Sequence, residues 1–237
     1  MAVESFSPGM PAHADRPLGG RRSVVVFGRL QRDIVLGLLK PGTPLLELEL
    51  AQRFGCSQGT VREALLLLQE EGLVQRAAHR GTHVCDCTAD DAGELVRLRH
   101  DIECRGVVRV LERYDPALRA ALAGLIDDMR AAARADDEYL LSQHDRSFHL
   151  ALHEAAGLPT VQPILQRCLI HNHRYKILNA DGPRALAETA ERHVAILEAL
   201  DSGDPDRAAA ALSHHITTIF DLGPHLFDPV VPAARTR

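Results

Sequence analysis

The sequence predicts a mainly α-helical protein in two parts: a small helical module that carries a two-stranded β-hairpin, followed by an antiparallel six-helix bundle. Three observations predict this fold class. Of the 237 residues, 46% are hydrophobic but only 4% are aromatic, so Ala, Leu, Val and Ile must form the core, a mixture that favours helices. Apolar residues recur at helical spacing along most of the chain. Pro and Gly divide this pattern into segments of helix length.

The two ends of the chain differ from the rest in composition. Residues 1–22 hold Pro, Gly, His and Arg without an apolar stretch, so they predict a flexible tail rather than a signal peptide, and residues 223–237 predict a second tail. No apolar run approaches the ~20 residues that span a bilayer. The five cysteines have irregular spacing, which does not suggest a disulfide framework. These features predict a cytoplasmic protein that does not bind a membrane.

Charge is unevenly distributed along the chain, whose net charge is −5. Residues 21–84 hold nine Lys or Arg against six Asp or Glu, a balance of +3, whereas residues 85–237 hold 17 against 24, a balance of −7. A mildly basic part that precedes an acidic part is expected of a DNA-binding head joined to another module.

The first module, residues 23–86, predicts three helices and a hairpin. A Pro41-Gly42 turn ends the first helix, Gly55 ends the second, and Ser57 can cap the third. Gly81 follows the turn between two short β-like segments. The predicted elements are helices over 23–38, 46–54 and 57–71 and strands over 73–77 and 81–85.

Two helices joined by a short turn and followed by a two-stranded wing are the arrangement of a winged helix-turn-helix. The third helix would enter the major groove, where Ser57, Gln58 and Thr60 would face bases and Arg62 a phosphate. A small helical hairpin that binds nothing is the alternative interpretation. The complete predicted set of DNA-binding residues is Arg53, Ser57, Gln58, Thr60, Arg62, Arg80 and Gly81.

The stretch from Lys40 to Val84 closely resembles the DNA-binding domain of the GntR family of bacterial transcription regulators. The matching pieces are Pro41-Gly42, Leu50-Ala51, Ser57, VREAL (61–65), EGLV (71–74) and Gly81. Family members usually have Ser-Arg-Thr-Pro before VREAL, where this chain has Ser-Gln-Gly-Thr. The missing Arg removes a common guanine contact, and Gln58 suits adenine better, so we expect an atypical operator.

The second module, residues 88–222, has a long helical pattern. Thr88 begins it with a capping-box-like spacing to Asp91, and Pro or Gly marks the breaks between helices. The predicted helices are 88–113, 115–134, 137–157, 159–179, 183–202 and 204–222. Bundles of this kind place metal ligands on inward-facing helix positions.

Acidic and imidazole side chains share one face of the helix predicted over 137–157. Asp145 and His149 are four residues apart, so they lie on the same stripe. That stripe alone fits a solvated polar face as well as a metal site. His193 and His215, on two further helices, make the metal interpretation stronger, because imidazole and carboxylate together suit Zn, Ni or Mn.

This module resembles the FCD domain, the helical effector domain of the FadR-like branch of GntR regulators, over roughly residues 90–220. The resemblance rests on Arg99-x-x-x-Glu103, Asp145-x-x-Phe148-His149, Glu191-x-His193, Gly203-Asp204 and His215-Ile216. It implies that Asp145, His149, His193 and His215 bind one divalent metal. The six helices and the short link before Thr88 also resemble the VanR-type subgroup.

An open metal position beside basic and hydroxyl side chains predicts a small organic or sugar acid as effector. The resemblance places Arg99 and Thr189 near such a ligand, and Arg99 could hold a carboxylate in a fork. An ion pair between Arg99 and Glu103 is the alternative role for Arg99.

We therefore expect a homodimeric, ligand-responsive transcriptional regulator of double-stranded operator DNA rather than an enzyme. A metal-ion sensor without an organic effector is the nearest alternative. A metalloenzyme is a more distant one, because no second general base stands at a motif spacing.

Overall fold

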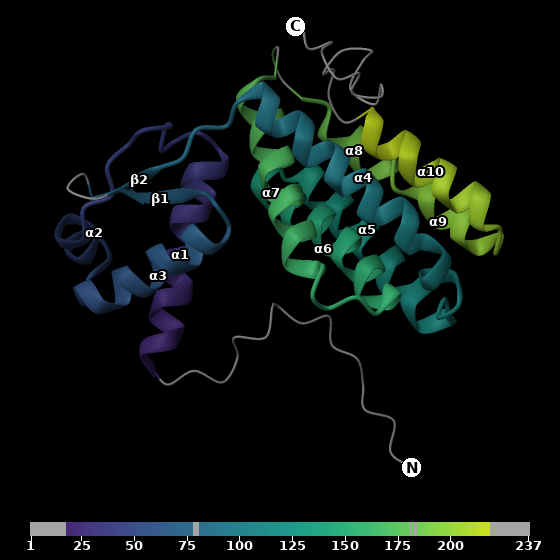
Figure 1. Cartoon of the computed structure of the whole chain (residues 1–237), viewed down its shortest axis with the longest axis horizontal. Helices are drawn as coiled ribbons and strands as arrows, with labels where there is room; N and C mark the ends of the chain where they lie inside the picture. Colours follow the sequence, from purple (N-terminus) through teal and green to yellow (C-terminus); the bar gives the residue numbers. More distant parts are fainter. Residues whose placement is uncertain (1–17, 78–80, 181, 183, 219–237) are drawn as a thin grey trace, which may run out of the picture.

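The computed structural model describes residues 18–77, 81–180, 182 and 184–218. Its fold is mainly helical with one two-stranded antiparallel sheet, which confirms the predicted fold class. Figure 1 shows the first module beside a bundle of helices. The predicted tail over 223–237, most of the predicted tail over 1–22, and Arg80 lie outside the described residues. Among the described residues, no helix combines the length and apolar character needed to cross a membrane.

The first module contains three helices and a hairpin, as the sequence predicts. Its elements are α1 (Leu18–Val35), α2 (Glu47–Phe54), α3 (Gln58–Glu70), β1 (Val74–Ala77) and β2 (Gly81–Val84). The hairpin pairs Val74 with Val84 and Ala77 with Gly81. Pro44 adds an isolated bridge to His83 and so ties the segment before α2 to the wing.

Helix α1 is displaced from its predicted range of 23–38. It begins at Leu18, inside the segment predicted as a tail, and it ends at Val35. The chain then turns through Gly37, whose φ of 72° is a conformation that glycine adopts without a steric penalty. Leu38, the last residue of the predicted helix, is therefore beyond the helix and 69% exposed.

The turn between α2 and α3 is built by two local signals. Gly55 ends α2 with a left-handed φ of 59°, as C-terminal glycines commonly do. Ser57 caps α3, because its hydroxyl accepts a hydrogen bond from the Thr60 backbone NH at 3.1 Å. These two residues set the direction in which α3 leaves the turn.

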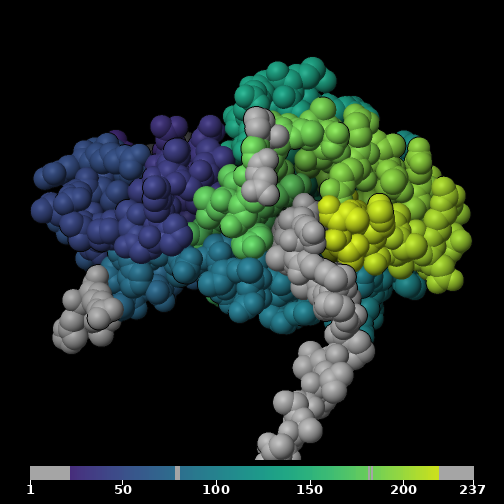
Figure 2. All heavy atoms as spheres, turned by 90° about the horizontal axis from the view of Figure 1, so that it is seen from above, coloured from purple at the N-terminus to yellow at the C-terminus, as the bar shows by residue number. Residues whose placement is uncertain are grey.

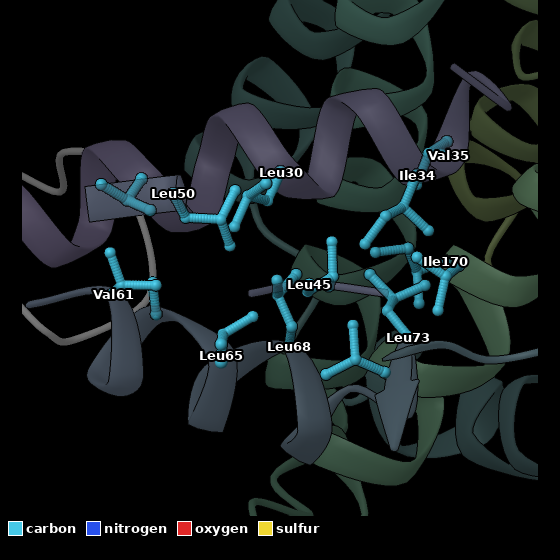
Figure 3. Packing of buried hydrophobic residues seen from close by; sticks show 14 of the residues in the cluster. Leu30, Ile34, Val35, Leu45, Leu50, Val61, Leu65, Leu68, Leu73 and Ile170 are labelled. Carbon is cyan, nitrogen blue, oxygen red and sulfur yellow. The ribbon is translucent and has the colours of Figure 1, made fainter. Parts of the chain in front are cut away.

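The core of the first module is aliphatic, and it includes residues from the second module. Leu30, Ile34 and Leu68 are fully buried in it. Tyr139 and Ile170, both from the bundle, belong to the same cluster, and Figure 3 shows Ile170 close to Leu73. The core of the first module thus extends onto α6 and α7, whereas the bundle has a separate apolar core of its own.

The bundle contains seven helical segments among the described residues: α4 (Ala89–Leu111), α5 (Pro116–Arg134), α6 (Glu138–Ala156), α7 (Gln162–Leu178), α8 (Leu186–Glu191), α9 (Val194–Asp201) and α10 (Pro205–Thr217). The helix predicted over 183–202 is divided into α8 and α9 at Arg192 and His193. Both residues keep right-handed helical dihedral angles, and the His193 NH bonds to the Ala190 carbonyl three residues back. The division is therefore a single tight turn rather than a change of direction. Membership of the VanR-type subgroup stays a prediction.

The two modules meet through α1, α3, α6 and α7. The Tyr139 hydroxyl on α6 donates to Gln31 Oε1 on α1 at 2.6 Å. Gln31 and Gln166 each donate to one carboxylate oxygen of Glu71, at 2.6 and 3.0 Å. Figure 2 shows the green residues of α7 next to the purple residues of α1. Helices α6 and α7 are therefore in direct contact with the first module.

Candidate metal centre and nucleic-acid interface

The N-terminal end of α3 presents most of the predicted DNA-reading residues to solvent. Gln58 is exposed and has no recorded side-chain partner among the described residues. Ser57 is exposed as well, but its hydroxyl already caps α3 and lies 3.0 Å from the Thr60 hydroxyl. Gly81 is exposed at the start of β2 with a φ of 73°. The capping role that the sequence predicts for Ser57 is confirmed, so its hydroxyl is already engaged before any base approaches.

Two arginines predicted to contact DNA are exposed but held in ion pairs. Arg62 donates through Nη2 to Glu47 at 2.6 Å and through Nε at 3.2 Å. Arg53 donates to Asp33 at 2.9 Å. The pKa of Glu47 is lowered by its hydrogen bond to Arg62, so the carboxylate is ionised at neutral pH. Each guanidinium is thus oriented on the surface before any phosphate approaches.

The predicted metal ligands come together inside the bundle from four places in the chain. Asp145 and His149 lie on α6, His193 at the turn between α8 and α9, and His215 on α10, and all four are buried. The three imidazoles form a group whose nitrogens lie within 4.8 Å of one another. Asp145 Oδ2 is 3.5 Å from His193 Nε2, and Oδ1 is 3.8 Å from His149 Nε2.

The hydrogen bonds of the imidazoles show which nitrogen of each ring is free. His149 Nδ1 is 2.5 Å from Glu103 Oε2, and His193 Nδ1 is 2.8 Å from the Thr189 carbonyl oxygen. Both oxygens can only accept, so both rings carry their proton on Nδ1 and present the Nε2 lone pair inward. Holding the outer NH of a ligating histidine in this way is the usual arrangement around metals.

The inward lone pair of His193 has no hydrogen-bond donor within the described protein. His193 Nε2 is buried without a hydrogen bond and faces the Asp145 carboxylate, so two acceptors point at each other. His149 Nε2 is 3.2 Å from His215 Nε2. Donors bonded to one Zn at ~2.0–2.2 Å lie roughly 3.4 Å apart in a tetrahedron, close to these separations. The residues therefore fit a divalent cation.

Electrostatics keep the centre in the form that metals bind. Burial alone would raise the pKa of Asp145, but His173, His193 and His149 hold it well below its usual range. His173 also lies 3.0 Å from Asp145 Oδ1. Burial lowers the pKa of His193 to about 4 and that of His215 well below its ordinary value. A carboxylate beside neutral imidazoles is the protonation state of a metal site.

Arg99 makes two contacts at the edge of the centre. Its Nε donates to Glu103 at 2.6 Å, which is the ion pair that the sequence left open as an alternative. Its Nη2 donates to His149 Nε2 at 2.8 Å, so it occupies a lone pair that faces the histidine group. Its Nη1 is buried without a partner among the described residues. Arg99 and Glu103 together fix the orientation of His149.

A pocket adjoins the centre, and both predicted effector-binding residues line it. Its walls are Arg99, Asp145, Asn172, His173, Lys176, Thr189, Arg192 and His215. Asn172, Lys176 and Arg192 were missed from the sequence. Asn172 and Lys176 are one turn apart on α7, and Lys176 is one of only two lysines in a chain that otherwise uses Arg, which is a signal that sequence reasoning could have used.

The other histidines take simpler roles. His153 is buried next to the centre, and its Nε2 lies 3.1 Å from the Leu158 carbonyl oxygen. His214 is exposed, and His144 is partly exposed near Asp128. His171 Nε2 is 2.9 Å from the Glu71 carbonyl oxygen and so belongs to the contact between the modules.

Comparisons with known proteins agree with this organisation. Residues 22–84 match the gntR family of bacterial regulatory proteins, and residues 94–218 match the FCD domain. The chain is 31% identical over 223 residues to a protein of Paraburkholderia xenovorans described as an uncharacterized HTH-type transcriptional regulator, BphR. That match covers 90% of this chain and 89% of BphR.

Solved structures show the same fold. A putative GntR transcriptional regulator from Rhodococcus sp. RHA1 aligns with a TM-score of 0.66 and 28% identity, over 84% of this chain and 95% of that one. McbR/YncC of E. coli aligns with a TM-score of 0.70 and 24% identity, over 83% and 94%. The matched families are those of transcriptional regulators, which confirms the prediction that the chain is not an enzyme. This chain is therefore a DNA-binding transcriptional regulator of the GntR family with an FCD effector domain.

Proposed function

We propose that this regulator binds operator DNA as a homodimer in the cytoplasm, and that its bundle binds one divalent metal together with a small carboxylate effector. Zn, Ni and Mn are the metals that suit a mixed imidazole and carboxylate set. A dimer would let two copies of α3 read half-sites one helical turn apart. The observation that carries the proposal is the inward-facing, unpartnered Nε2 of His193 beside Asp145.

Asp145, His149, His193 and His215 would hold the metal, which when bound supplies a positive charge and open positions for an acidic ligand. Arg99 would give up its hydrogen bond to His149 Nε2 if that nitrogen held a metal, because one lone pair cannot serve both. Its Nη1 already lacks a partner. Both terminal nitrogens then become available as a fork for a carboxylate.

Effector binding would reach the DNA-reading module through the helices that line the pocket. Asp145 and His149 share α6 with Tyr139, which contacts Gln31. Asn172 and Lys176 share α7 with Ile170, which packs in the core of the first module. The effector changes DNA affinity only by its differential affinity for two arrangements of these helices, typically ~1–3 kcal/mol.

Metal content tests the first half of the proposal. We expect about one Zn, Ni or Mn per chain in protein purified without chelator, measured by inductively coupled plasma mass spectrometry. His193→Ala and His215→Ala should each lose most of it, because a site of few ligands tolerates the loss of one poorly. His214→Ala is the matched control, since this exposed neighbour should leave the content unchanged. Equal metal content in all four proteins contradicts the assignment.

DNA binding with and without acids tests the second half. A carboxylate that raises the melting temperature of the metal-loaded protein, but not of the chelated protein, should also change operator affinity. If metal alone changes operator affinity and no acid does, the chain is instead a metal-ion sensor. If footprinting finds no two-fold symmetric protected site, the dimeric reading mode is wrong.

A further inference from the structure

The pocket beside the metal centre holds more positive charge than one carboxylate can neutralise. Arg99, Lys176 and Arg192 line it from α4, α7 and the turn after α8, whereas Asp145 is the only acidic residue among its lining residues. The Asp145 carboxylate already faces His173, His193 and His149. Arg99 is paired with Glu103, so Lys176 and Arg192 are the pocket cations that have no ion pair among the described residues.

Lys176 is the clearest case. It makes no hydrogen bond or ion pair with the described residues; the Asp145 carboxylate attracts its ammonium group, whereas Arg184, Arg192 and Arg99 repel it. Burial lowers the pKa of its ammonium group to about 8. A partly buried ammonium that makes no ion pair, and whose one attracting carboxylate already faces three histidines, is poorly compensated. An anion placed here would remove that penalty.

Arg192 and Asn172 complete a second binding region. Arg192 donates to the His215 carbonyl oxygen at 2.9 Å and to the Thr218 carbonyl oxygen at 3.1 Å, which fixes the guanidinium beside the pocket. Asn172 Nδ2 donates to the Ala92 carbonyl oxygen, and this leaves the buried Oδ1 without a donor. An unpartnered acceptor in a pocket selects a ligand that can donate, such as a hydroxyl group.

We infer that the effector carries two anionic groups: one for Arg99 and the metal, and a second for Lys176 and Arg192, with a hydroxyl for Asn172. This inference rests on the proposed function and names its ligand class as a hydroxylated dicarboxylate. A monocarboxylate would leave Lys176 uncompensated. A ligand without a hydroxyl would leave Asn172 Oδ1 unpaired.

Calorimetry on the full chain loaded with Zn tests the inference. Unbranched dicarboxylates of three to six carbons are each compared with the monocarboxylate of equal length, and succinate is compared with malate. We expect at least one dicarboxylate to bind about tenfold or more tightly than its partner, and malate to bind more tightly than succinate. Equal affinities within every pair would overturn the inference. So would the absence of binding by every acid in the panel.

Matched variants assign the preference to the second region. Lys176→Met and Arg192→Gln should each reduce the ratio of dicarboxylate to monocarboxylate affinity toward one, with monocarboxylate affinity little changed. Lys40→Met is the control, because Lys40 is the other lysine of the chain and is exposed in the first module. Two lysines also allow nuclear magnetic resonance of ¹³C-labelled lysine, in which only the Lys176 signal should shift with the dicarboxylate.

The result separates this inference from the function on which it rests. Metal-dependent binding of monocarboxylates, without any preference for a second anionic group, keeps the proposed function and removes the inference. Tight dicarboxylate binding with equal affinity in the presence and absence of metal would support the role of Lys176 and Arg192 in holding the second anionic group. It would also show that the metal takes no part in effector binding. A dicarboxylate preference that survives both substitutions places the second anionic group elsewhere.

Discussion

The two modules place their functional side chains in opposite environments. The DNA-reading module has an aliphatic core and carries its polar residues on the surface, where Arg62 and Arg53 are paired but exposed. The bundle places its polar residues inside, where Arg99, His149 and His193 are fully buried. In the first module, the candidate DNA-contacting residues lie outside the core. In the second, the candidate site residues are themselves buried.

This difference has an energetic consequence. A surface ion pair contributes little, because water and salt screen it. A buried charge that loses its partner is costly, because neither water nor protein compensates it. Substitutions of equal size in the two modules should therefore change different properties, and the following predictions test that contrast.

The largest effect on stability is expected from Glu103→Ala. This change removes the carboxylate that accepts from Arg99 Nε and from His149 Nδ1. We expect a loss of ~3–5 kcal/mol in the free energy of unfolding, because the buried Arg99 guanidinium is left without its anion. Urea denaturation of metal-free protein measures it. Glu94→Ala on the same helix removes an exposed pair with Arg97 and is the control. A loss below ~1 kcal/mol would contradict the buried pair.

A smaller effect is expected at the boundary between the modules. Tyr139→Phe deletes one hydroxyl and leaves Gln31 Oε1 without its donor. The expected loss is ~1–3 kcal/mol, since the acceptor stays buried. Tyr114→Phe removes an exposed hydrogen bond to Asp201 within the bundle and serves as the comparison. If both variants unfold at the same urea concentration as the wild type, the polar contact between the modules contributes nothing.

The smallest effect on stability is expected from Arg62→Ala, together with a clear effect on DNA. Its pair with Glu47 is exposed, so the free energy of unfolding should change by less than ~1 kcal/mol. Operator affinity should fall for all sequences alike, and the slope of log K against log salt should decrease by about 1. Gln58→Ala should instead relax base preference. Arg134→Ala, in the bundle, is the control and should leave the salt slope unchanged. An unchanged salt slope in Arg62→Ala as well would show that Arg62 does not contact a phosphate.

Local signals in the sequence predicted most of the fold. Gly55 and Ser57 act over a few residues, so their pattern was sufficient to place the turn between α2 and α3. The prediction that the first helix extends to Leu38 was wrong, because the apolar spacing continues past the turn at Gly37, where the chain has already left the helix. The division of the predicted helix at His193 could not be predicted from the sequence. Arg192 and His193 keep helical dihedral angles, so neither position needs a residue type that would mark a break.

The cluster of proposed metal ligands could be predicted only through a combination of spacing and resemblance. Asp145 and His149 share a helix face, but nothing in their spacing brings His215 close to them. That proximity depends on the packing of α10 against α4, a contact between segments about a hundred residues apart. Lys176 and Arg192 were missed for the same reason. A charged residue on a helix is usually exposed, and only the assembled bundle shows that these two line a pocket.

The link between the modules is held by the bundle. Arg174 on α7 is fully buried, and its guanidinium donates to the carbonyl oxygens of Cys85 and Asp86 at 2.7 and 3.3 Å. A fragment that begins at Thr88 would keep the buried Arg174 guanidinium but lose the Cys85 and Asp86 carbonyl oxygens that accept its hydrogen bonds. The effector domain is therefore a poor candidate for isolated expression, and exchange of reading heads between relatives should keep residues 85 and 86 with the bundle. In evolutionary terms, the unit that can be recombined ends before the link.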